Sequence, residues 1–256
     1  MSDESEALYK PYDQFILFGD SITQQSSNPE TGFGIHGALQ NDYIRHLDVI
    51  NRGFSGYNTA HALKVFPKFF PTPERATVRI MVIFFGANDA CVPSSAQHVP
   101  LDVYKENLKT IIQHPATVAQ NPRIVLLTPT PVDQYQLQGF DESKGSPHPS
   151  RTASHTKLYA EAVREVGSSL GVPVADVWSA FMSAVGWKEG ETLPGSRDLP
   201  EIKTFRDSLP MVCLHLTADG YQVVYDTITE AIRVNWPDQQ PAQLRMIHPG
   251  WLDAPK

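Results

Sequence analysis

The chain has 256 residues, enough for one large domain with its own hydrophobic core. Hydrophobic residues make up 41% and charged residues 19%, a composition that excludes a disordered or fibrous protein. The formal net charge is -7 and no run of basic residues occurs, so a nucleic-acid partner is not expected.

The N-terminal sequence MSDESEALYKPYD is acidic and polar, and it lacks the basic start and apolar stretch of a signal peptide. No window along the chain approaches the roughly 20 apolar residues of a membrane span. Only two cysteines, Cys91 and Cys213, are present, and no Asn-x-Ser/Thr glycosylation sequon occurs. We therefore expect a cytoplasmic protein without a membrane span.

Short apolar runs alternate with segments of helical spacing along the chain. The runs predict strands at residues 15–18, 48–51, 78–85, 123–127 and 172–175. The intervening segments predict helices at residues 34–46, 58–70, 101–114, 154–170 and 217–236. Because the runs are continuously apolar, they are typical of strands buried on both faces of a parallel sheet. The alternation predicts an α/β fold, a three-layer α/β/α sandwich with a five-stranded parallel sheet.

Helix-capping residues and loop segments mark the ends of the predicted elements, and none of them suggests a second domain. Gly171 follows the fourth helix as a C-cap, and Thr217 is a plausible N-cap of the last helix. Residues 129–151 and 186–210 are rich in Gly, Pro, Ser and charged residues, which predicts two long loops that are either functional or disordered. We expect one domain over residues 1–256, with its core at about 14–236 and a surface tail at 237–256. Four aromatic residues of the loops are candidates to line an apolar cleft: Tyr135, Phe140, Trp187 and Phe205.

Chemically capable residues follow the strands, at the edge where parallel sheets bind ligands. Ser21 ends the sequence FILFGDS, Gly53 lies in NRGFSGYNT, Asn88 lies in GANDA, and His215 precedes the last helix in CLHLTADGY. Taken singly, each has a structural explanation: a helix cap for the serine, turn residues for the glycine and asparagine, a loop position for the histidine. Together they supply what ester hydrolysis requires, a hydroxyl, a base for its proton and donors for an oxyanion.

These blocks, in this order, resemble the SGNH or GDSL hydrolase superfamily over roughly residues 14–236. The stretches FGDSITQ, NRGFSGYNT, FFGANDA and HPGWLDAP resemble its isoamyl acetate-hydrolysing esterase branch. The Gly-x-Ser-x-Gly signature is absent, which disfavours the α/β-hydrolase fold. The resemblance implies a flavodoxin-like fold and a carboxylic ester hydrolase that acts on small or short-chain esters through a serine acyl-enzyme.

The resemblance also implies a role for each matching residue. Ser21 would be the nucleophile and His215 the general base. The oxyanion donors would be the backbone N–H groups of Ser21 and Gly53 and the side-chain amide of Asn88. Asp20 and Asp89 are expected to brace the loops that carry these groups.

One position departs from the family pattern. The superfamily places an aspartate three residues before the histidine, where this chain has Val212. We consider three explanations: a Ser-His dyad, a substitute carboxylate from Asp207 or Asp198, or a site weakened at this position. Asp219 is a poor substitute, because it follows Thr217 where acidic residues favour a helix N-terminus.

Other chemistries have little support in the sequence. Cys91 and Cys213 are better explained as small buried residues than as a thiol nucleophile or redox switch. The nine histidines lack metal-ligand spacing, and no dinucleotide or Walker loop follows the first strand, so neither a metal nor a cofactor is expected. The alternatives are an acyltransferase that uses the same residues and a catalytically impaired binding protein. We expect a small-molecule ester as the partner, with a homodimer as the candidate assembly.

Overall fold

The computed structural model describes residues 11–143, 145, 149–199, 211–212 and 215–254, and only the backbone of 211–212. Its main sheet has five strands in the order β2-β1-β3-β4-β5, and all neighbouring pairs are parallel. The strands are β1 (Asp13–Gly19), β2 (Leu47–Gly53), β3 (Val78–Phe84), β4 (Arg123–Leu127) and β5 (Val174–Ala175). Each of the five predicted strands is present, so the predicted parallel sheet is confirmed.

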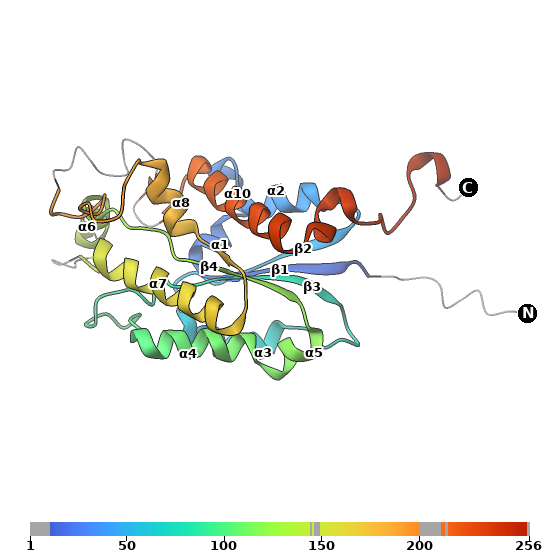
Figure 1. Cartoon of the computed structure of the whole chain (residues 1–256), viewed down its shortest axis with the longest axis horizontal. Helices are drawn as coiled ribbons and strands as arrows, with labels where there is room; N and C mark the ends of the chain where they lie inside the picture. The colour runs from blue at the N-terminus through green and yellow to red at the C-terminus, as the bar shows by residue number, and fades with distance from the viewer. Residues whose placement is uncertain (1–10, 144, 146–148, 200–210, 213–214, 255–256) are drawn as a thin grey trace, which may run out of the picture.

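Helices cover both faces of this sheet (Figure 1). One face carries α2 (Ile35–Asp42), α8 (Val177–Ala184) and α10 (Ala218–Asn235), and the other carries α3 (Thr59–Phe69), α4 (Leu101–Ile112) and α7 (Ala153–Leu170). Alternate residues of β1 belong to the two cores: Phe15 and Leu17 pack toward α2 and α10, and Ile16 and Phe18 pack toward α3. The predicted three-layer sandwich is therefore confirmed.

Phe18 shows why this strand is an apolar run. Its ring is fully buried and packs edge-on against Phe85, with ring centroids 4.8 Å apart. Two further rings of α3, Phe66 and Phe69, lie 5.6 and 5.0 Å away. Aromatic burial of this kind fixes the height of the strand and hence the position of the residues that follow it.

Several short elements escape the sequence patterns. They are α1 (Ser21–Gln25), α5 (Pro115–Gln120) and α6 (Gln134–Ser143), the 3-10 turns η2 (Pro29–Thr31), η4 (Pro237–Gln239), η5 (Pro241–Gln243) and η6 (Trp251–Asp253), and the antiparallel pair β6 (Met211–Val212) and β7 (His215–Leu216). The expectation of a continuous loop over residues 129–151 is wrong, because α6 lies inside it. Helix α6 has only one fully buried apolar side chain, Leu137, so it carries little helical periodicity.

Predicted helix ends agree with the structure. Thr217 is the N-cap of α10, and its side chain accepts a hydrogen bond from the Gly220 N–H. Gly171 ends α7 in the left-handed conformation, with φ 64° and ψ 29°. No helix in the described part of the chain is long and apolar enough to cross a lipid bilayer.

The strand order defines where a ligand can enter. From β1 the chain crosses to β2 on one side, and β3 then adds on the other side of β1. The connections after β1 and β3 therefore leave the sheet in opposite directions, and the carboxyl ends of two such strands are the place where an open parallel sheet binds ligands. Ser21 follows β1 and Asn88 follows β3.

Candidate active site

Ser21 lies at the first position of α1, immediately after β1. Asp20 is the N-cap of this helix, and its Oδ1 accepts the Ile22 N–H at 2.9 Å. The helix-cap explanation of Ser21 is therefore wrong, because the preceding residue performs that task. The Ser21 hydroxyl instead lies 3.1 Å from Nε2 of His215, although the two residues are 194 positions apart. Only 4% of Ser21 is exposed.

His215 reaches the serine from β7, just before α10. Its Nε2 also lies 3.5 Å from Nε2 of the Gln25 amide. An amide N–H can only donate, so this contact is a hydrogen bond when the neutral ring carries its proton on Nδ1 and Nε2 is the acceptor. Burial first, and then the positive charge of Arg151, lower the pKa of His215 below its ordinary value. A neutral imidazole at pH 7 can accept the proton of the serine hydroxyl.

Asn88 lies in a hydrogen-bonded network that fixes its side-chain amide. Its Nδ2 donates to the Tyr57 carbonyl at 2.8 Å. Its Oδ1 accepts from Nη2 of Arg151 at 2.9 Å and from Nε2 of Gln97 at 3.2 Å. Because Nδ2 carries two protons, one N–H of this buried amide has no acceptor among the described residues and is available to a ligand.

Gly53 and Gly56 differ in how their backbone N–H groups are used. The Gly53 N–H already donates to Oδ1 of Asn51 at 2.8 Å, which occupies the group that the sequence assigns to the oxyanion. The Gly56 N–H has no acceptor among the described residues. The Gly56 carbonyl accepts from Nε2 of Gln97, the same atom that donates to Asn88. Gly56, which the sequence motifs do not single out, therefore borders the Asn88 network.

Two buried carboxyl groups support the site, as expected. Asp89 is fully buried, and its Oδ1 accepts from the N–H and the hydroxyl of Thr59 at 2.9 and 2.5 Å. This pairing holds the start of α3 against the segment that carries Asn88. Burial raises the pKa of Asp89 to about 6, and burial together with the nearby Asp89 raises the pKa of Asp20 to about 7.

Four positions bear on which group, if any, pairs with His215 in place of the family's aspartate. The backbone of Val212 pairs with His215 in the antiparallel β6–β7 ladder. Asp207 lies outside the described residues. Asp198 is exposed, and its carboxylate accepts from the Ser196 hydroxyl at 2.9 Å. Asp219 lies in the first turn of α10, as expected. Within the described residues, Nδ1 of His215 has no carboxylate partner.

Cys91 is a buried residue near this network. It is fully buried, and its thiol lies 3.9 Å from Oε1 of Gln97. Burial raises the pKa of the thiol, so it stays protonated at neutral pH. This agrees with its interpretation as a small packing residue, whereas Cys213 lies outside the described residues. Among the described residues, no group of three or more His, Cys, Asp or Glu side chains has metal-binding geometry.

The loop aromatics do not share one environment. The Trp187 ring packs edge-on against Trp178, and its indole N–H donates to the Glu191 carbonyl. Tyr135 donates its hydroxyl proton to the Leu199 carbonyl. Phe205 lies outside the described residues. The structure thus gives Trp187 and Tyr135 local packing roles.

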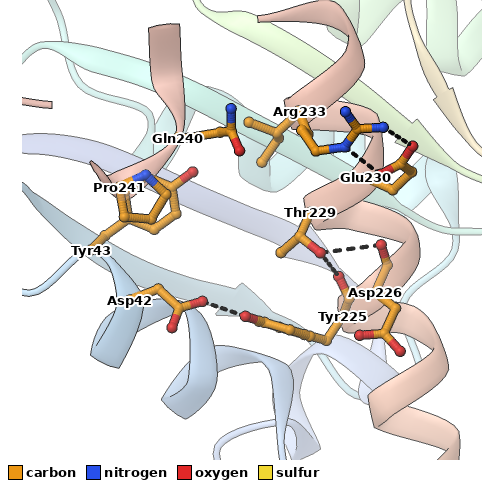
Figure 2. Close-up of a pocket in the computed structure, with 10 residues that line it drawn as sticks. Asp42, Tyr43, Tyr225, Asp226, Thr229, Glu230, Arg233, Gln240 and Pro241 are labelled. Atoms are coloured by element: carbon orange, nitrogen blue, oxygen red, sulfur yellow. Dashed lines mark hydrogen bonds and ion pairs between the residues drawn. The ribbon is translucent and has the colours of Figure 1, made fainter. Parts of the chain in front are cut away.

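A separate cavity of about 390 Å³ lies between α2 and α10 (Figure 2). Asp42, Tyr225 and Arg233 are among its lining residues, and none of the predicted catalytic residues contributes to it. The Tyr225 hydroxyl donates to Asp42, and Arg233 pairs with Glu230 (Figure 2). Because none of the predicted catalytic residues lines it, this cavity is distinct from the site at Ser21.

An α/β/α sandwich with a serine after its first strand and a histidine within reach of it defines a serine esterase of the GDSL/SGNH type. The chain belongs to the GDSL-like lipase/acylhydrolase family, whose model matches residues 17–223. It is 34% identical over 237 residues to a GDSL esterase/lipase of Arabidopsis thaliana, covering 89% of both chains. It is 35% identical over 253 residues to the human isoamyl acetate-hydrolyzing esterase 1 homolog, covering 94% of this chain and 88% of the relative. The resemblance predicted from the sequence blocks is therefore confirmed.

Solved structures agree with the fold. The crystal structure of a lipase/acylhydrolase from Enterococcus faecalis superposes with a TM-score of 0.61 at 23% identity, covering 93% of this chain and all of that chain. At this level of identity the comparison concerns the fold alone. It confirms the arrangement of sheet and helices that brings the ends of β1 and β3 together.

Sequence reasoning brought together Ser21, Asn88 and His215, and it missed two residues of their surroundings. Gln97 and Arg151 both donate to the Asn88 carbonyl oxygen. The first comes from the segment between β3 and α4, and the second from the segment that enters α7. Neither lies at the end of a strand, and neither is part of a motif, so no pattern in the sequence points to them.

Proposed function

We propose that the protein hydrolyses small or short-chain carboxylic esters through an acyl-enzyme on Ser21. The observation that carries this proposal is the 3.1 Å separation of Ser21 Oγ and His215 Nε2. In the first step the hydroxyl oxygen attacks the ester carbonyl while its proton passes to Nε2. The imidazolium then protonates the departing alcohol, and a water molecule releases the acid by the same route in reverse.

The tetrahedral intermediate needs donors for its oxyanion. We propose the Ser21 N–H, the free N–H of the Asn88 amide and the Gly56 N–H, the last in place of Gly53. The Gly53 N–H is already bonded to Asn51, whereas the peptide at Gly56 and Tyr57 contacts the Asn88 network on both sides. Loss of one such donor costs about 100- to 1,000-fold in rate, so Asn88→Ala tests this assignment separately from the nucleophile.

We further propose that Ser21 and His215 act as a dyad. Val212 stands where the superfamily has its aspartate, and the described residues offer His215 no substitute carboxylate. A dyad retains measurable catalysis, because the neutral ring already has its acceptor nitrogen toward the serine. Small esters fit the name of the human relative, which refers to isoamyl acetate.

The decisive experiment compares Ser21→Ala with Ser26→Ala on a short-chain p-nitrophenyl ester and on isoamyl acetate. Ser26 is the matched control, because it is similarly buried at the other end of α1, and its hydroxyl bonds to the Thr23 carbonyl and the Asn51 amide. We expect activity and fluorophosphonate labelling to disappear in the first variant and to persist in the second. A wild-type protein that neither hydrolyses these esters nor takes the label would refute the proposal.

The dyad has its own test in Val212→Asp. If the dyad is sufficient, this variant changes kcat/KM by less than about 10-fold, a small effect beside the roughly 10,000-fold cost of losing an orienting aspartate in a triad enzyme. A larger gain in kcat/KM would show that the valine impairs a triad. Product analysis with added alcohol separates hydrolysis from acyl transfer.

A further inference from the structure

Arg151 is buried beside the site without a carboxylate partner in the described part of the chain. Only 4% of the residue is exposed, and none of the ion pairs formed by described residues includes it. A buried cation is costly to keep out of water unless its donors are satisfied. The groups that accept hydrogen bonds from Arg151 therefore explain why this cation can be buried here.

The guanidinium donates hydrogen bonds to the segment that carries Asn88. Its Nε donates to the Ala87 carbonyl, and its Nη2 donates to Oδ1 of Asn88 at 2.9 Å. Its Nη1 donates to the Ser150 hydroxyl at 3.0 Å, which ties the group to its own loop. Arg151 thus binds the Ala87 carbonyl, just before Asn88, and the side chain of Asn88 through two nitrogens of one planar guanidinium group.

These hydrogen bonds have two consequences for the Asn88 side-chain amide. A guanidinium can only donate, so the atom of Asn88 that faces it must be the carbonyl oxygen, and the amide nitrogen must face the other way. A full positive charge on the carbonyl end also polarises the amide and strengthens the hydrogen bonds that its N–H groups donate. Gln97 supplies a second donor to the same oxygen, but without charge.

We propose that Arg151 is a positioning residue of the oxyanion hole, which fixes the orientation of the Asn88 amide and strengthens it as a donor. The proposal rests on the function proposed above. Arg151 does not touch the substrate and acts through Asn88.

The test compares Arg151→Met and Arg151→Lys with the matched control Arg164→Met. Arg164 lies on α7, is half-buried and pairs with the Asp176 carboxylate, so its loss tests the general effect of removing an arginine from this layer. We expect Arg151→Met to lower kcat by about 10- to 100-fold with KM changed less than 3-fold, because the lost interaction acts in the transition state. Arg151→Lys keeps the charge but not the two-armed geometry, and we expect a smaller loss of kcat.

A double-mutant cycle separates positioning from general damage. If Arg151 acts through Asn88, its substitution costs less than about 3-fold in an Asn88→Ala background, since the group that it positions is gone. Full multiplication of the two effects would overturn the proposal, and so would an equal loss of kcat in Arg164→Met. If Arg151→Met does not fold, the same cycle is run with Arg151→Lys. Failure of the esterase proposal itself is seen separately, in an unaffected Ser21→Ala variant.

Discussion

Gly53→Ala is the substitution whose effect follows most directly from the geometry of the site. A Cβ atom at this position would lie 2.0 Å from the backbone N and 2.4 Å from the Cα of Gln24. Ordinary van der Waals contact begins at 3.4 Å, so the end of β2 and helix α1 must separate by about 1.4 Å. Because the contact is with backbone, no side-chain rotation can relieve it. Helix α1 begins with Ser21, so the displacement changes the position of the nucleophile relative to His215.

The expected losses are large in rate and moderate in stability. A misplacement of about 1 Å at a reacting group costs about 100-fold, and overpacking of this kind destabilises a protein by about 1–3 kcal/mol. We expect Gly53→Ala to lower kcat for a short-chain p-nitrophenyl ester by about that factor and to lower the urea midpoint. The N–H of residue 53 survives in the variant, so the loss does not report removal of an oxyanion donor.

Gly37→Ala provides the matched control. Gly37 lies in the interior of α2, and an added Cβ there would meet no atom within 4 Å. Alanine at such a helical position stabilises by about 0.5–1 kcal/mol and should leave kcat unchanged. If Gly53→Ala retained kcat within about 3-fold and an unchanged urea midpoint, the close approach of β2 and α1 would not control the position of Ser21.

Three further results follow from burial and charge. The rate of ester hydrolysis should rise with pH as His215 loses its proton, and the midpoint should lie below the ordinary pKa of histidine. Arg151→Met should move that midpoint upward, because the positive charge of Arg151 is one of the two causes of the lowered pKa. Burial raises the pKa of Asp20 to about 7 from its ordinary value of 3.8, so its contribution to the free energy of unfolding falls as pH rises between these values. Urea titrations should therefore show a smaller decline over this window in Asp20→Asn, and an unchanged decline would contradict the assignment. Phe18→Ala should lower the free energy of unfolding by about 3–5 kcal/mol, measured by the same titrations, because the ring is fully buried among other rings.

The sheet and the central pair of the site could be predicted because burial and topology leave few alternatives. Strands such as 123–127 are continuously apolar, since helices cover both of their faces, and the structure has that strand with the predicted bounds. Parallel strands share one carboxyl edge, which brings Ser21 and Asn88 together without any knowledge of loops. The short helices α1 and α6 could not be predicted, because one turn or a weak apolar face leaves no periodic signal.

The use of individual hydrogen-bonding groups could not be predicted either. Whether Gly53 or Gly56 offers a free N–H depends on the orientation of the Asn51 side-chain amide. That orientation is set by its hydrogen bond to the Thr23 carbonyl of α1. The contact of Arg151 with Asn88 joins residues 63 positions apart through a loop whose path is set by tertiary packing. Sequence patterns report which side chains are buried, and they do not report which of several nearby donors is already engaged.

The two layers of the site differ in how firmly the fold holds them. Ser21 and Asn88 lie in short buried segments after strands whose residues are almost wholly buried, so their backbones move only if the core moves. Gln97 and Arg151 come from connecting segments, and they are held by the very bonds that they make to Asn88, Ala87 and Gly56. Substitution of a core residue beneath the strands should therefore reduce stability and rate together. Substitution of Arg151 should reduce the rate more than the stability, because the strand ends stay in place while the amide loses its fixed orientation.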